Sequence, residues 1–282
     1  MRIVRTISEM RGISAAARCD GKVIGLVPTM GALHAGHIEL ALKARLECGI
    51  VIMSIFVNPI QFGPNEDYNA YPRTLEADAE KAQAAGVDYI FAPSAQEMYP
   101  REPLAHVDVD KLTEHLCGAS RPGHFRGVAT VVAKLFNITR PDRAYFGMKD
   151  AQQLRVIRRM NEDLDFGIEI VPVPIVREDD GLAMSSRNAY LSPMDRERAV
   201  VLSRSLKLAQ QMVRNGETSS AAIKDAMGKL ILSEVPGAKV DYIEVVDDDT
   251  VQPVSNISGP VLIALAVKIG STRLIDNMTV RP

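Results

Sequence analysis

Short apolar runs recur along the first two thirds of the chain, and segments with helical periodicity separate them. We expect strands at residues 23–27, 50–57, 87–92, 143–146 and 168–174. Continuous apolar strands of this kind are typical of a parallel sheet that is covered on both faces. Helical periodicity marks residues 36–47, 73–85, 128–138 and 150–163. The β-α-β-α alternation predicts an α/β fold with a Rossmann-like doubly wound parallel sheet.

The pattern changes after about residue 187. Apolar residues at spacings of three or four predict one long amphipathic helix over residues 193–215, with Pro193 in its first turn and Gly216 after its end. A second helix at 219–233 and three strand-like runs at 240–246, 261–267 and 272–275 follow. We therefore expect a Rossmann-like domain over residues 1–180 and a smaller C-terminal α+β domain over residues 181–282. The polar stretch 177–181 marks the predicted boundary.

The composition narrows the class of protein. Of the 282 residues, 46% are hydrophobic and 24% are charged, which is typical of a globular chain. The 33 basic residues nearly balance the 35 acidic ones, so we expect neither a nucleic-acid partner nor an anionic membrane surface. The apolar runs are too short to span a bilayer, and we expect no targeting segment. Three widely separated cysteines predict reduced thiols and a cytoplasmic protein.

The first polar motif follows the strand at 23–27 and leads into a helix. It reads Pro-Thr-Met-Gly-Ala-Leu-His-Ala-Gly-His over residues 28–37. Such a loop favours phosphate, because its N–H groups are free and the helix dipole is positive there. His34 and His37 can both face a bound phosphate and donate hydrogen bonds to developing charge. A plain turn with two exposed histidines is the simpler alternative, and a zinc pair lacks further ligands at suitable spacing.

Two further motifs also lie at predicted strand ends. Asn58 and Gln61 follow the second strand, where open α/β sheets bind ligands, and their amides can donate or accept. A plain turn around the neighbouring proline is the alternative for this motif. Lys149 offers a point charge to a carboxylate or phosphate, Asp150 can cap the next helix, and Gln153 lies one turn further on.

The fourth motif lies at the predicted domain junction. Val176 and Arg177 precede it, and its centre reads Met-Ser-Ser-Arg-Asn over residues 184–188. Two hydroxyls beside the Arg187 guanidinium make a compact grip for a polyphosphate, and a junction loop can close over a nucleotide. A polar linker without function is the alternative that composition alone favours.

Together these motifs resemble one known family. The segments 28–37, 55–62, 121–125, 146–153 and 184–188 closely resemble those of the pantothenate synthetases, which belong to the nucleotidylyltransferase superfamily. His-Ala-Gly-His at 34–37 looks like that family's version of the superfamily H-I-G-H signature. Met-Ser-Ser-Arg at 184–187 looks like its counterpart of K-M-S-K-S. The match runs in order over nearly the whole chain.

The resemblance implies an ATP-dependent ligase. In that family (R)-pantoate attacks the α-phosphate of ATP to give pantoyl adenylate and pyrophosphate. The amine of β-alanine then attacks the acyl carbon, which gives pantothenate and releases AMP. Mg²⁺ accompanies the phosphates, and the resemblance implies a homodimer and a C-terminal domain that closes over the active site. The apolar helix at 128–138 could serve either the core or the dimer interface.

The resemblance also assigns residues to the site. His37, His34 and Lys149 form the expected catalytic group, with His37 as the donor to the phosphates. The residues expected to bind pantoate are Gln61, Gln153 and Asn58. Gln61 is also expected to border β-alanine, and the Val176 main chain is expected near adenine. The residues expected to line the ATP site are Met30, Gly31, Ala32, Leu33, His34, Ala35, Gly36, His37, Gly147, Met148, Lys149, Asp150, Val176, Met184, Ser185, Ser186 and Arg187.

Two positions depart from the family pattern, and two alternatives stay open. Met148 stands where an acidic residue is usual, so Lys149 lacks its usual negative neighbour. The stretch that the family associates with the metal reads Glu-Ala-Asp at 76–78, so the protein ligands of a metal are left unknown. One alternative is a nucleotidylyltransferase of the same fold whose product keeps the nucleotide. The other is a nucleotide-sensing or tRNA-binding module without chemistry, which the balanced charge disfavours.

Overall fold

The computed structural model describes residues 1–64 and 66–282, which form two compact units. The first unit comprises Met1–Val109, Arg121–Met148 and Gln153–Pro174, and the second comprises Asp110–Ser120, Lys149–Gln152 and Ile175–Pro282. The second unit therefore includes two short segments that lie earlier in the sequence. The contiguous division between residues 180 and 181 stays a prediction.

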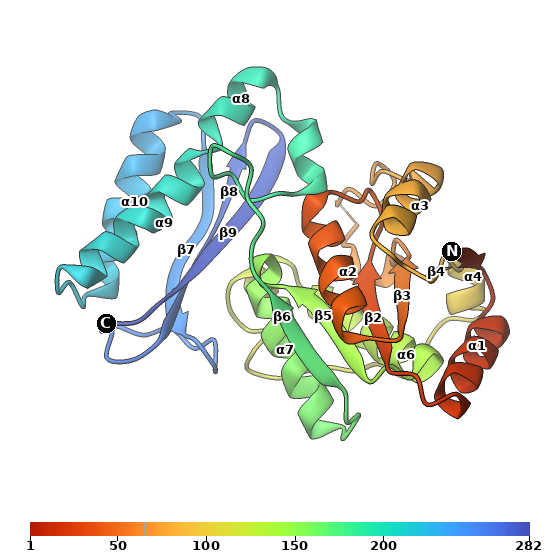
Figure 1. The fold of residues 1–282 in the computed structure, drawn as a ribbon. Helices are drawn as coiled ribbons and strands as arrows, with labels where there is room; N and C mark the ends of the chain where they lie inside the picture. Colours follow the sequence, from red (N-terminus) through yellow and green to blue (C-terminus); the bar gives the residue numbers. More distant parts are fainter. Residues whose placement is uncertain (65) are drawn as a thin grey trace. The chain divides into compact units, whose positions relative to one another are not determined.

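Six parallel strands form the sheet of the first unit (Figure 1). Their order is β1-β4-β3-β2-β5-β6, and all neighbours run parallel. The bounds are β1 Arg2–Val4, β2 Ile24–Thr29, β3 Ile50–Ile55, β4 Tyr89–Phe91, β5 Arg143–Gly147 and β6 Glu169–Val173. This arrangement confirms the predicted doubly wound sheet. The sequence did not predict β1, because its three residues are too few for a pattern and only Val4 is buried.

The direction in which strands are added changes beside β2. From β2 the chain continues outward through β3 and β4, and it later adds β5 and β6 on the opposite side of β2. Because these strands are parallel, the carboxyl ends of β2, β3 and β5 lie at one edge of the sheet. Open α/β sheets bind ligands at a switch point of this kind.

Both faces of this sheet are covered, as continuous apolar strands predict. Val27 and Met53 pack in a cluster with α2 (Ala35–Glu47), and α2 in turn contacts α3 (Leu75–Ala84). The alternating residues Leu26 and Ile52 point to the opposite face, where they are buried too. Helices α1 (Ile7–Cys19) and α6 (His124–Thr139) contact each other and β2.

The apolar residues of α6 belong to the core of the chain. Val128, Leu135 and Phe136 are each at most 3% exposed, and most other residues of this helix are buried as well. Of the two roles that the sequence allowed for residues 128–138, the structure therefore supports the core. A dimer interface would have to use another surface.

The second unit is built on an antiparallel sheet in the order β7-β8-β9. Its strands are β7 Lys239–Asp247, β8 Val261–Ile269 and β9 Thr272–Val280, and two helices, α9 Val201–Arg214 and α10 Ser220–Glu234, pack against them (Figure 1). Leu206, Ile223 and Leu265 are fully buried in the core between these layers. The predicted α+β character of the C-terminal part is confirmed.

The prediction of a single long helix over residues 193–215 is wrong. The chain forms α8 (Pro193–Arg198) and then α9, with a tight turn between them at Ala199 and Val200. There the Leu202 N–H donates to the Ala199 carbonyl, which lies three residues back. The apolar spacing continues through this tight turn, so the sequence pattern does not reveal it.

One further long helix, α7, and several short elements complete the description of residues 1–64 and 66–282. They are η1 Pro59–Gln61, α4 Ala95–Met98, α5 Cys117–Ser120, η2 Met148–Asp150, α7 Ala151–Asp163 and η3 Ser186–Tyr190. Two of them, η1 and η2, lie just beyond the carboxyl ends of β3 and β5. Within residues 1–64 and 66–282, no helix has both the length and the apolarity that crossing a membrane requires.

An ion pair inside the second unit provides a test of its packing. Arg177 Nη1 and Nη2 bind the two carboxylate oxygens of Asp276 at 2.7 and 2.9 Å, and the Asp276 side chain is only 1% exposed. We expect Arg177→Met to lower the free energy of unfolding of this unit by about 3 kcal/mol, because it leaves a buried carboxylate without its partner.

The matched control is Lys229→Met, which breaks an exposed ion pair with Asp225 in the same unit. This change should alter the free energy of unfolding by less than about 0.5 kcal/mol. Scanning calorimetry of both variants measures the difference. An equal loss in the free energy of unfolding for both variants would mean that the buried pair stabilises this unit no more than the exposed one does.

Candidate functional site

A carboxylate from α3 holds the loop between β2 and α2. Asp78 is fully buried, and its two oxygens accept hydrogen bonds from the N–H groups of Ala32 (2.8 Å) and Leu33 (2.7 Å). Lys81, on the same helix, donates to the Leu33 carbonyl at 2.7 Å. Gly31 and Ala32 take left-handed conformations, with φ angles of 86° and 51°. The shape of this loop is therefore set by α3.

These bonds correct the expectation that the N–H groups of the loop are free for phosphate. Two of them are taken by Asp78. The N–H groups of His34 and Gly36 donate to histidine rings, and that of His37 donates to the His34 carbonyl. The two imidazoles and the positive end of the α2 dipole also lie here, and they can attract an anion.

His34 and His37 form a capping box at the start of α2. The His34 Nδ1 accepts from the Gly36 N–H at 3.1 Å, and the His37 Nδ1 accepts from the His34 N–H at 3.3 Å. The two ring centroids lie 4.0 Å apart. Because a backbone N–H can only donate, both Nδ1 atoms are unprotonated, and each neutral ring carries its proton on Nε2. Each histidine therefore combines a structural bond with an Nε2–H donor.

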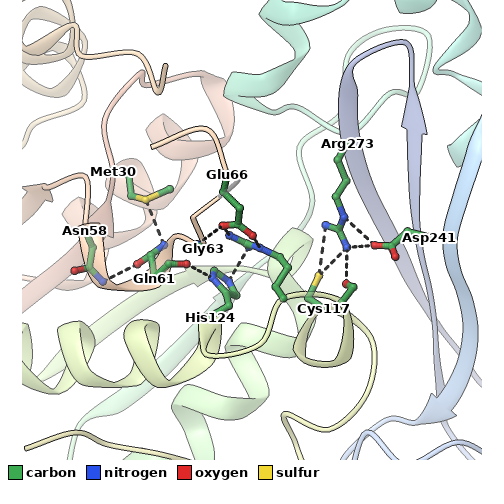
Figure 2. Close-up of polar contacts among 11 residues, drawn as sticks. Met30, Asn58, Gln61, Gly63, Glu66, Cys117, His124, Asp241 and Arg273 are labelled. Carbon is green, nitrogen blue, oxygen red and sulfur yellow. Dashed lines mark hydrogen bonds and ion pairs between the residues drawn. The ribbon is translucent and has the colours of Figure 1, made fainter. Parts of the chain in front are cut away.

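The amides of Asn58 and Gln61 bind each other at the end of β3. Asn58 Nδ2 donates to Gln61 Oε1 at 3.0 Å (Figure 2) and to the Gly127 carbonyl at 3.2 Å. Gln61 Nε2 donates to the Met30 sulfur at 3.4 Å, and Tyr99 donates to Asn58 Oδ1 at 2.8 Å. Since Met30 belongs to the loop after β2, two neighbouring strand ends contribute to one polar cluster.

This cluster depends on the close approach of α6 to η1. A Cβ atom at Gly127 would lie 2.4 Å from the Ile60 carbonyl oxygen and 2.6 Å from the Gln61 Cα. Any residue with a side chain would therefore push η1 away from the helix. Glycine at position 127 brings its own carbonyl within reach of Asn58.

The Arg-Pro-Gly-His-Phe motif at 121–125 supports Gln61 through its main chain. His124 Nδ1 donates to the Gln61 carbonyl at 2.9 Å, and its Nε2 accepts from Arg121 at 2.9 Å (Figure 2). Arg121 binds both oxygens of Glu66 at 2.6 Å. Burial acts to raise the pKa of Glu66, but the Arg121 guanidinium outweighs it and holds that pKa below its usual value.

Several of the remaining predicted ATP residues lie in a hairpin of the second unit. The Met184 N–H donates to the Val176 carbonyl at 3.0 Å, so this hydrogen bond joins two residues of the predicted ATP site. Ser185 then begins η3, and its hydroxyl accepts from the Arg187 N–H at 3.3 Å. The second unit thus holds these residues in one hairpin and the turn that follows it.

Lys149 is positioned through its main chain. Its carbonyl accepts from the Nδ2 of Asn277 on β9 at 2.7 Å. Asn277 is buried, and its own N–H donates to Asp276 at 2.8 Å. No local pattern indicates this role, because Asn277 lies 128 residues further along the chain.

Two polar side chains fasten the segment 110–120 within the second unit. Gln152 Oε1 accepts from the Cys117 N–H at 3.0 Å, and its Nε2 donates to two carbonyls of the segment. Arg273 binds Asp241 at 2.6 Å and lies 3.7 Å from the Cys117 sulfur (Figure 2). Burial acts to lower the pKa of Arg273, but Cys117 and Asp241 outweigh it and raise that pKa overall.

A protein site for a metal ion needs several ligating side chains close together. Among the described residues, no group of three or more His, Cys, Asp or Glu side chains could hold a metal. Asp78, in the 76–78 stretch, already has both oxygens occupied by N–H donors. Mg²⁺ commonly binds through substrate phosphates and water, with few protein ligands. In residues 1–64 and 66–282 these side chains therefore form no metal cage of three or more ligands.

The predicted site residues are divided between the two units. In the first unit the structure joins Met30, Asn58 and Gln61 by hydrogen bonds, and Gln153 lies in the first turn of α7. Gly147 and Met148 belong to this unit as well, whereas Lys149 and Asp150 belong to the second. Five residues that contact the site residues or fasten the segments beside them were not predicted as site residues from the sequence. They are Asp78, Tyr99, Gly127, Gln152 and Asn277.

The fold and these contacts define a doubly wound α/β protein with a cluster of polar side chains at the carboxyl edge of its parallel sheet. The sequence model of the pantoate-beta-alanine ligase family matches residues 2–279. Over 280 residues the chain is 57% identical to the pantothenate synthetase of Heliobacterium modesticaldum and 58% identical to that of Caldicellulosiruptor saccharolyticus, with 99% of both chains covered each time. The chain therefore belongs to the pantoate-beta-alanine ligase family.

Solved structures agree with this assignment. Pantothenate synthetase from Thermus thermophilus superposes with a TM-score of 0.93 at 47% identity, and the match covers 100% of each chain. A pantoate-beta-alanine ligase from Francisella tularensis, complexed with beta-gamma ATP and β-alanine, gives a TM-score of 0.79 at 36% identity over 99% of this chain and 97% of that chain. The resemblance carried by the motifs is confirmed over the whole length.

The capping box predicts a measurable effect on stability. We expect His34→Ala to lower the free energy of unfolding by about 1 kcal/mol, because it removes the acceptor for the Gly36 N–H. His34→Asn should retain most of the stability, since Asn is among the preferred N-cap residues. Urea unfolding of the two variants tests the assignment, and a larger loss for Asn than for Ala would contradict it.

Proposed function

We propose that this chain is an AMP-forming ligase that condenses (R)-pantoate with β-alanine. ATP is the second substrate, and the products are pantothenate, AMP and pyrophosphate, with pantoyl adenylate as the intermediate. The observation that carries the proposal is that the loop before the two-histidine capping box meets the buried Asn58 and Gln61 amides, through Met30, at the ligand edge of one sheet. Membership of the pantoate-beta-alanine ligase family supports the same reaction.

The first half-reaction needs donors that are positioned in advance. A carboxylate is a weak nucleophile, and the α-phosphate that it attacks is part of a polyanion. In the proposed step a pantoate carboxylate oxygen bonds to the α-phosphorus, and the bond from that phosphorus to the bridging oxygen breaks. Negative charge passes to pyrophosphate as it leaves. The Nε2–H groups of His34 and His37, at the positive end of α2, are suited to stabilise that charge.

The second half-reaction uses the activated acyl group. The amine of β-alanine attacks the acyl carbon of pantoyl adenylate, the amine loses a proton, and AMP leaves with the electrons of the broken acyl–oxygen bond. No covalent bond to the chain is needed in either step. Gln61 is proposed to border both pantoate and β-alanine, with Asn58 and Gln153 as further pantoate contacts.

The residues proposed to line the ATP site are those that the resemblance assigns: the loop at 30–37, Gly147 and Met148, and the hairpin and turn that carry Val176 and residues 184–187. Lys149 is proposed to place its ammonium beside the phosphates, and the C-terminal part is proposed to close over the bound nucleotide. Mg²⁺ is proposed to arrive with ATP and to neutralise part of the phosphate charge.

A homodimer and a cytoplasmic location are also proposed. The homodimer rests on the resemblance to the family, and the location rests on the composition and the three isolated cysteines. Since the apolar side chains of α6 are buried within the chain, the proposed interface uses other residues.

The reaction order gives the principal test of this function. The chain should exchange labelled pyrophosphate into ATP in the presence of pantoate and Mg²⁺ without β-alanine, because the adenylate forms before the amine is used. Adding β-alanine should release free AMP. A strict requirement for β-alanine would contradict the two-step order, and a product that keeps the nucleotide would favour the nucleotidylyltransferase alternative.

His37 provides a second test, and the capping geometry suggests the substitution to use. His37→Asn keeps a side-chain acceptor for the His34 N–H but lacks the Nε2–H donor. Pyrophosphate exchange should slow by about one hundred to one thousand fold, the range for losing one positioned donor to transition-state charge. If the ring acts mainly in the transition state, kcat should fall while ATP binding changes much less.

His37→Gln is the matched control, because its amide nitrogen can reach the position of the imidazole Nε2. This variant should recover part of the lost rate. Melting temperatures of both variants show whether the fold is retained. Normal turnover in folded His37→Asn would mean that the ring serves only as a helix cap.

A further inference from the structure

The amides of Asn58 and Gln61 have a direction that their neighbours impose. One end of the Asn58 amide lies 3.2 Å from the Gly127 carbonyl, and a carbonyl can only accept, so that end must be the nitrogen Nδ2. The same nitrogen lies 3.0 Å from the Gln61 amide, whose facing atom must therefore be the oxygen. It follows that Gln61 directs its own nitrogen, Nε2, toward the Met30 sulfur.

Tyr99 holds the opposite end of the Asn58 amide. Its hydroxyl donates to Asn58 Oδ1 at 2.8 Å. Tyr99 lies at the end of α4, its ring centroid is 6.2 Å from that of Phe56, and the Lys134 nitrogen lies 5.2 Å from the ring centre. Burial raises the pKa of the Tyr99 phenol well above its usual value, so the hydroxyl keeps its proton and remains a donor.

We infer that Tyr99 is a positioning residue for pantoate, because the Gly127 carbonyl fixes the direction of the amides and the Tyr99 hydroxyl holds Asn58 in place, so that Gln61 presents an N–H donor to the ligand. This inference rests on the proposed function. The Met30 sulfur is a weak acceptor, and an oxygen of pantoate is a stronger one that can take its place at Nε2. The ligand atom that binds Gln61 Nε2 is therefore an acceptor oxygen, from a carboxylate or a hydroxyl.

The same direction of the amide limits how β-alanine can approach Gln61. An ammonium group has only donors, so it cannot bind the Gln61 nitrogen. The carboxylate of β-alanine can.

Tyr99→Phe tests the inference with little change in packing, since the ring and its contacts are retained. In pyrophosphate exchange, the KM for pantoate should rise about threefold to tenfold, the effect of one hydrogen bond, while the KM for ATP changes by less than about twofold. A variant with an unchanged KM for pantoate, or with equal effects on both substrates, would overturn the positioning role.

Tyr145→Phe is the matched control. Tyr145 is fully buried in the same unit, and its hydroxyl donates to Glu47 at 2.9 Å, at the end of α2 opposite to the histidines. Its loss should lower stability about as much as the loss of the Tyr99 hydroxyl and should leave the KM for pantoate unchanged. An equal rise in both variants would mean that the effect is general to the fold, which would count against the inference.

A double-mutant cycle shows whether Tyr99 acts through Asn58. In an Asn58→Ala background the amide is absent, so adding Tyr99→Phe should raise the KM for pantoate by much less than it does in the wild type. If the two substitutions raised the KM for pantoate independently of each other, Tyr99 would not act through Asn58, and the inference would be overturned. Gln61→Glu supplies a second measurement if Tyr99→Phe folds poorly, because it replaces the donor by an acceptor of the same shape and should raise the KM for pantoate by more than about tenfold.

The wild-type enzyme separates this inference from the function on which it rests. If the wild type shows no exchange that depends on pantoate, the proposed function fails, and the inference fails with it. If the wild type exchanges as expected and a folded Tyr99→Phe leaves the KM for pantoate unchanged, the inference alone fails.

Discussion

Asp78 extends from α3 into the loop between β2 and α2 and accepts two N–H groups there, at 2.8 and 2.7 Å. A carboxylate with no exposed surface is costly to place away from water unless hydrogen bonds compensate for the lost hydration. The N–H groups of the loop provide that compensation only if the loop keeps its left-handed turn at Gly31 and Ala32. Carboxylate and loop therefore stabilise each other, and the start of α2 follows from the loop that precedes it.

The histidines at that start link stability to chemistry. His34 and His37 cap α2 through Nδ1, and this bonding leaves the proton of each neutral ring on Nε2. The same hydrogen bonds that begin the helix therefore use Nδ1 of each ring and leave Nε2 as the nitrogen that can donate to an anion.

The amide cluster follows a similar rule one strand further along the sheet. Asn58 and Gln61 are almost fully buried, so each of their polar atoms needs a partner. The Gly127 carbonyl can only accept, so it fixes the direction of the amides, and the Tyr99 hydroxyl donates to the Asn58 oxygen that this direction leaves on the other side. The closeness of α6 to η1, which requires glycine at position 127, decides that direction.

The sequence by itself determined the parallel sheet, the α+β character of the C-terminal part, the motifs at the strand ends and the family, because apolar periodicity and motif spacing are local properties of a chain. It did not reveal β1, which is too short for a pattern, or the turn that separates α8 from α9, where the apolar spacing is unbroken. Only the tertiary structure decided the partners of the site residues. Asp78 lies 46 residues from Ala32, Tyr99 lies 41 residues from Asn58, and Gly127 lies 69 residues from Asn58. The packing of helices against the sheet decides which polar groups come together over such separations. A local sequence pattern does not predict that packing.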